Sequence, residues 1–418
     1  MNIIDILNYV NIGIVAFFMI CYTYQFFYIF VAFVKKPKKY ESDKMHRFAV
    51  MIAARNEAGV VGNLIDSIKA QNYPSDLVDV YVVADNCTDN TVEVVKNAGA
   101  IVYERNNQKK IGKGFAMKFL FGKVMALRGE DYYDGYFIFD ADNLLDADFI
   151  AEMNKAFATN QVLTCYRNSK NYGTNWISAG YALWFLREAK YLNNPRSILG
   201  TSCAVSGTGF LIHKDIIKRN GGWNHFLLTE DIEFTIDTII HEEKIGYCHR
   251  AVLYDEQPIT FKQSWTQRLR WAKGYLQVFK YYGKELVKGV FTTKNWFSFF
   301  DMTMNIAPAV IVSALGIIIN LALIILSLFS GNFSIWVLIN GLLSLASNAY
   351  SMMFFIGLVT TVTEWKKIRC SNFKKILYVF TFPLFMLTYI PIAFTAFFKK
   401  VEWKPIEHSV DLSIDDLN

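Results

Sequence analysis

The chain has 418 residues, a formal net charge of +6 and an aromatic content of 16%, so it is long enough for two domains. Its six cysteines include no C-x-x-C pair, which argues against a zinc site or a disulfide framework and fits a reducing compartment. The positive charge lies mostly beside apolar stretches, which indicates the inner face of a membrane rather than nucleic acid.

The first long apolar stretch covers residues 7–34 and contains no charged residue. A helix of about 20 apolar residues crosses the hydrocarbon core of a bilayer, so this stretch is predicted to be a transmembrane helix. Its basic flank follows it, at Lys35, Lys36, Lys38 and Lys39, whereas a cleaved signal peptide carries such a flank in front. By the positive-inside rule, the next segment is expected in the cytoplasm.

Strand and helix patterns then alternate along the chain. Apolar runs predict strands at 48–54, 80–84, 101–103, 137–140 and 162–166, and apolar residues at helical spacing predict helices between the first four and at 176–192. This alternation predicts a mostly parallel sheet with helices on both faces.

Acidic residues follow several of these strands. Glu57, Asp85 and the pair Asp140 and Asp142 come directly after apolar runs. In open α/β sheets ligands bind outside the carboxyl ends of the strands, so we expect these acids to converge on one crevice. Carboxylates with a nucleotide diphosphate would complete the oxygen shell of Mg²⁺ or Mn²⁺. The alternative is that they are ordinary polar loop residues, with Asp140 and Asp142 in a solvated acidic turn.

Two later segments carry candidate chemistry. In 228–234, Asp231 lies among apolar residues and is a candidate general base, although Thr229 and the acids after it also fit the start of a helix. The helix predicted at 263–275 places Gln267, Arg270 and Trp271 on adjoining positions. Arginine can bind diphosphate oxygens and tryptophan can stack on a sugar, but the same helix also fits a position along the membrane interface.

The last third of the chain is apolar. Residues 302–363 contain no charge and have room for two membrane spans, with a break near 330–332. The basic loop 364–375 is then expected in the cytoplasm. The run 376–398 contains Pro383 and Pro391, and it either crosses the membrane or forms a re-entrant hairpin that keeps the tail inside.

Taken together, the motifs resemble those of membrane-embedded family 2 glycosyltransferases, the group of cellulose, chitin, hyaluronan and poly-N-acetylglucosamine synthases. They occur in the order of that family: Arg55-Asn56-Glu57, Asp85, Gly112-Lys113-Gly114, Asp140-Ala141-Asp142, Thr229-Glu230-Asp231 and Gln267-Arg268-Leu269-Arg270-Trp271. The first loop reads Ala-Ala-Arg-Asn-Glu where many members have Pro-x-Tyr-Asn-Glu. The second reads Ala-Asp-Asn-Cys-Thr-Asp where many have Asp-Asp-Gly-Ser-x-Asp. These departures leave the identity of the sugar open.

The resemblance implies an α/β GT-A-type nucleotide-sugar-binding domain between transmembrane α-helices. The implied division is a transmembrane helix at 7–34, a cytosolic GT-A domain at 45–260, interfacial helices at 261–300, a C-terminal transmembrane region at 302–398 and a tail at 399–418. The implied site residues are Glu57, Asp85, Lys113 and Asp140 for the nucleotide sugar, Asp142 for Mg²⁺ or Mn²⁺, Asp231 as catalytic base, and Gln267, Arg270 and Trp271 for the acceptor and diphosphate.

The implied activity is metal-dependent, inverting transfer from a UDP-sugar, of the glucose or N-acetylglucosamine type, to a growing β-linked polysaccharide. The enzyme would be a multi-pass protein of the plasma membrane with a cytoplasmic catalytic domain. One alternative is a non-processive enzyme that glycosylates a lipid acceptor. Another is an inactive membrane regulator that binds nucleotides. The expected partners are the UDP-sugar, a glycan or lipid acceptor and the bilayer, without nucleic acid.

Overall fold

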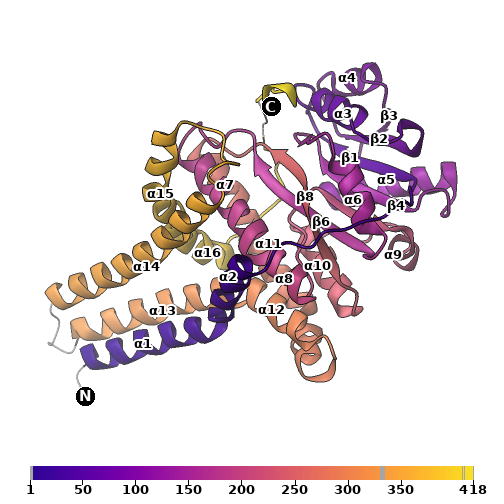
Figure 1. Cartoon of the computed structure of the whole chain (residues 1–418). Helices are drawn as coiled ribbons and strands as arrows, with labels where there is room; N and C mark the ends of the chain where they lie inside the picture. The colour runs from indigo at the N-terminus through magenta and orange to yellow at the C-terminus, as the bar shows by residue number, and fades with distance from the viewer. Residues whose placement is uncertain (1–2, 330–334, 407, 409, 418) are drawn as a thin grey trace.

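The computed structural model describes residues 3–329, 335–406, 408 and 410–417, and it consists of an α/β domain from which long helices project (Figure 1). The strands are β1 Phe48–Ala54, β2 Val78–Asp85, β3 Ile101–Arg105, β4 Gly135–Asp140, β5 Leu144–Leu145, β6 Val162–Ser169, β7 Phe210–His213 and β8 Ile245–Asp255. The helices of the α/β domain are α3 Val61–Lys69, α4 Thr91–Asn97, α5 Lys113–Arg128, α6 Phe149–Phe157, α7 Trp176–Glu188, α8 Asn194–Leu199, α9 Lys214–Arg219 and α10 Glu230–Ile240.

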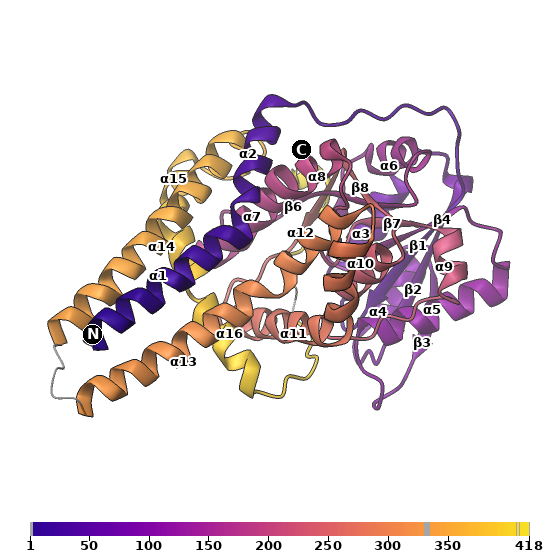
Figure 2. The ribbon, with the colours of Figure 1, turned by 90° about the horizontal axis from the view of Figure 1, so that it is seen from below.

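The remaining helices precede and follow this domain. They are α1 Ile3–Tyr22, α2 Tyr24–Val34, α11 Phe261–Thr292, α12 Trp296–Ile306, α13 Pro308–Phe329, α14 Ile335–Thr363, α15 Asn372–Leu387 and α16 Tyr389–Phe398. Figures 1 and 2 show α1, α13 and α14 side by side, extending away from the sheet. Asn11 and Asn320 exchange side-chain hydrogen bonds of 3.0 and 2.9 Å, which join α1 to α13.

The eight strands form one sheet in the order β3-β2-β1-β4-β7-β6-β8-β5. The half formed by β3, β2, β1 and β4 is parallel, as the alternation of strands and helices predicts. β7 runs antiparallel to both β4 and β6, and β5 runs antiparallel to β8, so the whole sheet is mixed. β6 and β8 pair in parallel, so beyond β4 the prediction of a mostly parallel sheet is wrong at the antiparallel strands β7 and β5, which it omitted.

Both faces of the sheet are buried, which explains why its central strands are apolar throughout. In β1, Met51 joins the hydrophobic cluster that includes α5 and α7, whereas Val50 and Ile52 join the cluster that includes α3 and α6. Ile138 and Phe139 of β4 divide in the same way. Side chains of a strand point alternately to its two faces, so a strand covered on both sides shows an unbroken apolar run. The expected helices on both faces are confirmed.

The predicted N-terminal span corresponds to α1 and α2, which meet at Thr23. Among the residues that the structure describes, two stretches are long and apolar enough to cross a membrane, 9–34 and 372–398. The expected break near 330–332 lies outside the described residues. The helix predicted at 176–192 is α7 followed by a π-helical segment, Ala189–Asn193. Asn175 caps α7 because its side chain accepts hydrogen bonds from the backbone N–H groups of Ile177 and Ser178.

Candidate active site

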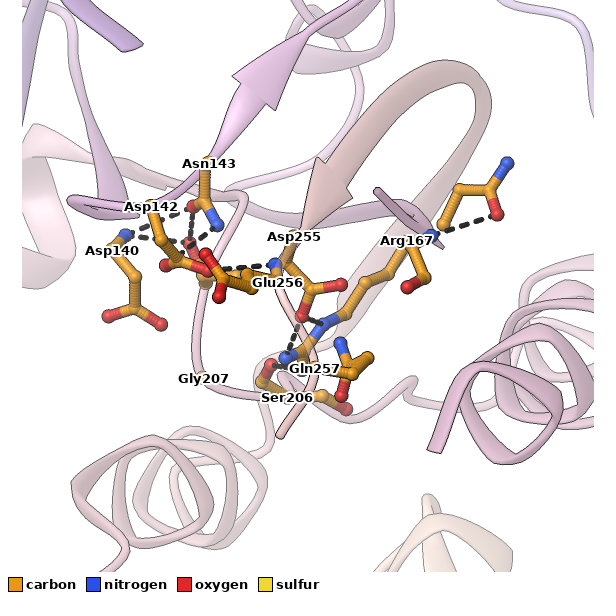
Figure 3. A network of polar contacts seen from close by, with 12 residues as sticks. Asp140, Asp142, Asn143, Arg167, Ser206, Gly207, Asp255, Glu256 and Gln257 are labelled. Carbon is orange, nitrogen blue, oxygen red and sulfur yellow. Dashed lines mark hydrogen bonds and ion pairs between the residues drawn. The ribbon is translucent and has the colours of Figure 1, made fainter. Parts of the chain in front are cut away.

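Asp140 and Asp142 lie in a tightly bonded turn at the carboxyl end of β4 (Figure 3). The Asp140 backbone N–H donates to Asn143 Oδ1 at 3.0 Å and to Thr208 Oγ1 at 2.9 Å. The buried Asp142 carboxylate accepts a hydrogen bond of 2.9 Å from the backbone N–H of Glu256, which follows β8. The turn is therefore held by two other segments, and its two carboxylates are fixed in different surroundings.

Lys113, the first residue of α5, contacts three groups at this place. Its ammonium group forms an ion pair with Asp140, donates to the Gly207 carbonyl oxygen at 2.7 Å and lies 4.0 Å from Glu230 Oε1. Burial lowers the pKa of Lys113, but Asp140 and Glu230 outweigh it and the pKa is raised. A buried cation is thus held permanently beside the carboxylates.

Gly207 lies between Asp140 and Asp231. Its φ of +83° belongs to the left-handed region that favours glycine. A Cβ atom at this position would be 3.8 Å from both Asp140 Oδ2 and Asp231 Oδ2. The two carboxylates therefore face the same small space, although they are separated by about ninety residues of chain. Because Gly207 has no side chain, no Cβ atom lies between these two carboxylates.

Asp231 and Glu230 begin α10 and share one buried environment. Burial raises the pKa of Asp231, opposed by the backbone N–H of Ile232 and by the charges of Lys113 and Arg270. Burial and the neighbouring Asp231 raise the pKa of Glu230 to about 7. Thr229 precedes the helix as expected, but its buried hydroxyl has no hydrogen-bond partner among the described residues and does not cap the helix. A carboxylate with a raised pKa beside fixed cations is suited to accept a proton.

Glu57 follows β1 and Asp85 ends β2, at the same edge of the sheet. The Glu57 carboxylate is bound by the His408 ring, with Nδ1 to Oε1 and Oε2 distances of 3.1 and 2.9 Å. The Asp85 carboxylate forms an ion pair with Arg105 and accepts a 3.1 Å hydrogen bond from the Asn86 side chain. Burial raises the pKa of both carboxyl groups, and these partners oppose the effect. In the described structure Asp85 does not contact Lys113, Asp140 or Asp231 directly.

Gln267, Arg270 and Trp271 lie on α11, as predicted, but they face different neighbours. The charge of Arg270 lowers the pKa values of Glu230 and Asp231, so this guanidinium lies near the pair. Trp271 packs against Tyr181 and Phe185 of α7, with ring centroids 5.7 and 6.2 Å apart. Gln267 Oε1 is buried without a partner among the described residues.

The sequence interpretation missed an ion pair that lies next to these residues. Arg167 of β6 donates from Nε to Asp255 Oδ2 at 2.6 Å and from Nη1 to the Ser206 carbonyl oxygen at 2.7 Å (Figure 3). Asp255 ends β8, and burial raises its pKa to about 6 although Arg167 lowers it. The signal was present, since the apolar run before Asp255 and Glu256 has the same form as the run before Asp140.

Oxygen ligands for one divalent cation are available around Asp142. Asp255, whose pKa the Asp142 charge also raises, has a buried Oδ1 atom without a partner in the described part of the chain. The described residues contain no group of three His, Cys, Asp or Glu side chains arranged to hold a metal ion. The carboxylate oxygens of Asp142 and Asp255 are of the hard type that Mg²⁺ and Mn²⁺ take as ligands.

Comparisons with known proteins extend this picture. Residues 46–274 match the family model described as "Glycosyltransferase like family 2". The chain is 27% identical over 235 residues to a beta-monoglucosyldiacylglycerol synthase of Synechocystis, covering 54% of this chain and 47% of the relative. It is 24% identical over 241 residues to a poly-beta-1,6-N-acetyl-D-glucosamine synthase of Staphylococcus epidermidis, covering 56% of each chain. The chain thus spans about half the length of these relatives.

A solved structure has a similar fold along nearly the whole chain. It is the mannosyltransferase PcManGT from Pyrobaculum calidifontis, in complex with GDP-Man and Mn²⁺, with a TM-score of 0.57 and 14% identity, covering 95% of this chain and 98% of that one. At this identity the match shows the fold alone. The family match covers more than half of the 418 residues and includes the strand-end acids, Lys113 and Asp231. The chain therefore belongs to the glycosyltransferases of family 2.

Proposed function

We propose that the enzyme is an inverting, divalent-metal-dependent hexosyltransferase that moves a sugar from a UDP-sugar to a hydroxyl group presented at the membrane surface. One observation carries this proposal. Lys113 and the carboxylates of Asp140 and Asp231 lie around Gly207, which brings a carboxylate suited to accept a proton close to a cation suited to bind phosphate. Transfer from a nucleotide sugar requires both groups at one place.

On the donor side, Glu57 and Asp85 would bind the nucleoside, and Lys113 and Asp140 would lie at the diphosphate. Asp142 would hold Mg²⁺ or Mn²⁺, with Asp255 near it. Such a cation neutralises the charge that develops on the departing diphosphate. Lys113 contributes to the same neutralisation through a charge that its buried contacts preserve.

On the acceptor side, Asp231 would take the proton of the acceptor hydroxyl while that oxygen attacks the anomeric carbon. The bond between the anomeric carbon and the diphosphate oxygen breaks in the same step, and UDP leaves with the bonding electron pair. With one base and no carboxylate assigned as nucleophile, a single displacement inverts the anomeric centre. An α-linked donor would therefore give a β-linked product. Arg270 and the unpaired Gln267 Oε1 would bind the diphosphate or acceptor hydroxyls, and Trp271 would stack on the sugar.

For the acceptor, we favour a lipid, because few helices in the described part of the chain extend away from the α/β domain. A polysaccharide channel has to be lined by helices, and α1, α13 and α14 are the helices that extend clearly from the domain (Figure 2). Two relatives named beta-monoglucosyldiacylglycerol synthase have 27% and 26% identity to this chain. Elongation of a β-linked polysaccharide is the second candidate, supported by the 24% identity to a poly-N-acetylglucosamine synthase.

We also propose that the enzyme is a multi-pass protein of the plasma membrane with its catalytic domain in the cytoplasm. The stretches 9–34 and 372–398 support membrane association. Large apolar side chains on α1 and α13 are exposed, among them Ile20 and Leu326, and such surfaces need an apolar environment. Lys35 to Lys39 follow the first stretch and support the cytoplasmic side for the catalytic domain.

The test uses purified full-length protein with Mn²⁺, vesicles containing diacylglycerol, and radiolabelled UDP-glucose, UDP-N-acetylglucosamine or UDP-glucuronate. A labelled product that dissolves in chloroform and carries one sugar supports the lipid acceptor. A labelled polymer that resists extraction supports the second candidate. If UDP with Mn²⁺ raises the melting temperature but no donor is turned over, the protein is a nucleotide-binding regulator and the proposed activity is wrong.

A further inference from the structure

The C-terminal tail, described at residues 399–406, 408 and 410–417, returns from α16 to the edge of the sheet that carries the proposed donor-site acids (Figure 1). His408 contacts both carboxylate oxygens of Glu57, and the backbone N–H of Val410 donates to Glu256 Oε2 at 3.1 Å. The side chains of Leu412 and Ile414 pack against the pair Leu144 and Tyr254. The tail is thus bound to the α/β domain by charged, polar and apolar contacts.

An earlier part of the tail lies against the loops that begin the donor site. The Arg55 guanidinium lies over the Trp403 ring, 5.4 Å from its centroid. A Cβ atom at Gly112, the residue before Lys113, would be 4.0 Å from Trp403 Cγ. The tryptophan therefore lies between the Arg55-Asn56-Glu57 loop and the start of α5.

Two N–H donors at this contact have no acceptor. Arg55 Nη1 and Trp403 Nε1 are both buried atoms without a hydrogen-bond partner in the described part of the chain. Buried donors are nearly always paired, and an unpaired one costs free energy. Two such atoms side by side at the edge of a nucleotide site indicate a ligand that brings oxygen acceptors.

We propose that the tail forms one wall of the donor site, in which Trp403 and Arg55 donate hydrogen bonds to the nucleoside diphosphate and His408 is a positioning residue for Glu57. This inference rests on the proposed function. The donor would lie beside the tail, with its oxygen atoms paired to the two free N–H groups. Glu57 would accept from the donor with the lone pairs that His408 leaves available.

Charge explains why Glu57 needs a positioning residue. Its side chain is 12% exposed, and the carboxylates of Asp142 and Asp140 raise its pKa in addition to burial. A desolvated carboxylate near two others is costly unless a cation or donor pairs with it. His408 supplies that partner and, by contacting both oxygens, fixes the orientation of the carboxylate.

The experiment measures UDP binding by calorimetry with Mn²⁺, and donor KM and kcat, on full-length protein. We expect His408→Ala to weaken UDP binding and raise donor KM about tenfold, the effect of one charge-assisted hydrogen bond, with kcat changed less than about twofold. His408→Gln keeps one side-chain donor and should recover most of the binding. Trp403→Phe keeps a ring but loses the N–H, and should weaken binding about three- to tenfold.

Lys400→Ala is the matched control, because this tail side chain is 90% exposed and its ion pair, at 3.9 Å, is with the exposed Glu402 of the tail itself. It should leave KM and kcat unchanged. UDP binding that His408→Ala and Trp403→Phe leave unchanged, or make tighter, overturns the inference, and tighter binding would mean that the tail competes with the donor. If the wild-type protein binds neither UDP nor GDP, the proposed function itself is wrong.

Discussion

Arg196 and Asp301 form a buried, two-pronged ion pair between α8 and α12. Nε lies 2.7 Å from Oδ2 and Nη2 lies 2.8 Å from Oδ1, and the two side chains are 1% and 0% exposed. The hydroxyl groups of Tyr24 and Tyr28 in α2 each donate to the same carboxylate at 2.7 Å. One carboxylate thus joins the N-terminal helix segment to the catalytic domain and to the helices that follow it.

Asp301→Asn should destabilise the protein by about 3–5 kcal/mol, because it leaves the Arg196 charge buried without its counter-ion. The measurement is the melting temperature in detergent. Tyr24→Phe is the matched control, since it removes one hydrogen bond and should cost about 1 kcal/mol. Equal melting temperatures for the two variants would show that the ion pair does not hold these helices together.

Asp231→Asn should reduce sugar transfer by about 10²–10⁴-fold while UDP binding stays within about twofold of wild type. Asparagine has the same shape but cannot accept the proton of the acceptor hydroxyl. Transfer is measured with radiolabelled donor and binding by calorimetry. A parallel loss of both would contradict the role of Asp231 as base and assign it to the donor.

Asp142→Asn should reduce transfer by about 10²-fold or more, because the metal that neutralises the leaving diphosphate loses a charged ligand. In the wild type, EDTA should abolish transfer, added Mn²⁺ should restore it, and UDP should raise the melting temperature only with Mn²⁺. The variant should lose this Mn²⁺-dependent increase. Asp66→Asn, on the exposed face of α3, is the control. An unchanged Mn²⁺ response in Asp142→Asn would exclude Asp142 as a ligand.

The rate of transfer should fall as the pH drops through the pKa of Asp231, because only the ionised carboxylate accepts a proton. That pKa is raised by burial, and the adjacent Glu230, itself with a pKa of about 7, is a like charge beside it. Glu230→Gln removes this charge and should shift the acidic limb of the rate profile to lower pH. Glu285→Gln, exposed on α11, should leave the profile unchanged. A shift of the limb to higher pH in Glu230→Gln would contradict this coupling.

The tail should lie on the same side of the membrane as the catalytic domain, because His408 contacts Glu57. Cysteines introduced at Lys400 and at Lys109 of the catalytic domain, with Cys87 and Cys370 replaced by serine, should react with an impermeant maleimide from the same side of sealed vesicles. The stretch 372–398 would then enter and leave the membrane on one face, as the re-entrant alternative requires. Reaction from opposite sides would mean that this stretch crosses the bilayer.

The sequence was sufficient where local patterns determine structure. The parallel strands and the strand-end acids follow from apolar runs that end in polar residues, and β1, β2 and β4 carry that pattern clearly. β7 has only four residues and follows two glycines, so its pairing with β4 and β6 depends on tertiary contacts. The hydrophobic pattern of the sequence therefore could not predict that the sheet is mixed.

The candidate site also combines residues that local motifs indicate with contacts that only the folded chain reveals. Lys113, Asp140 and Asp231 were candidates because each belongs to a motif with neighbours of the expected type, and the structure brings them together around Gly207. The contact between His408 and Glu57 joins residues 351 positions apart. Asp255 ends an apolar run that the sequence shows, but its pairing with Arg167 on another strand cannot be read from either segment alone. Long-range pairs of this kind are fixed by the packing of the folded chain.

The close approach of α10 and α11 has a consequence for engineering this enzyme. A side chain at Gly274 would begin 2.5 Å from the Thr229 side chain, so the helix that carries Arg270 and Trp271 cannot move independently of the residues that begin α10. Libraries that randomise position 274 in search of new acceptors should yield mostly inactive clones. Variation directed at α7, which contacts Trp271 from the other side, leaves this junction intact and is the better starting point for changing specificity.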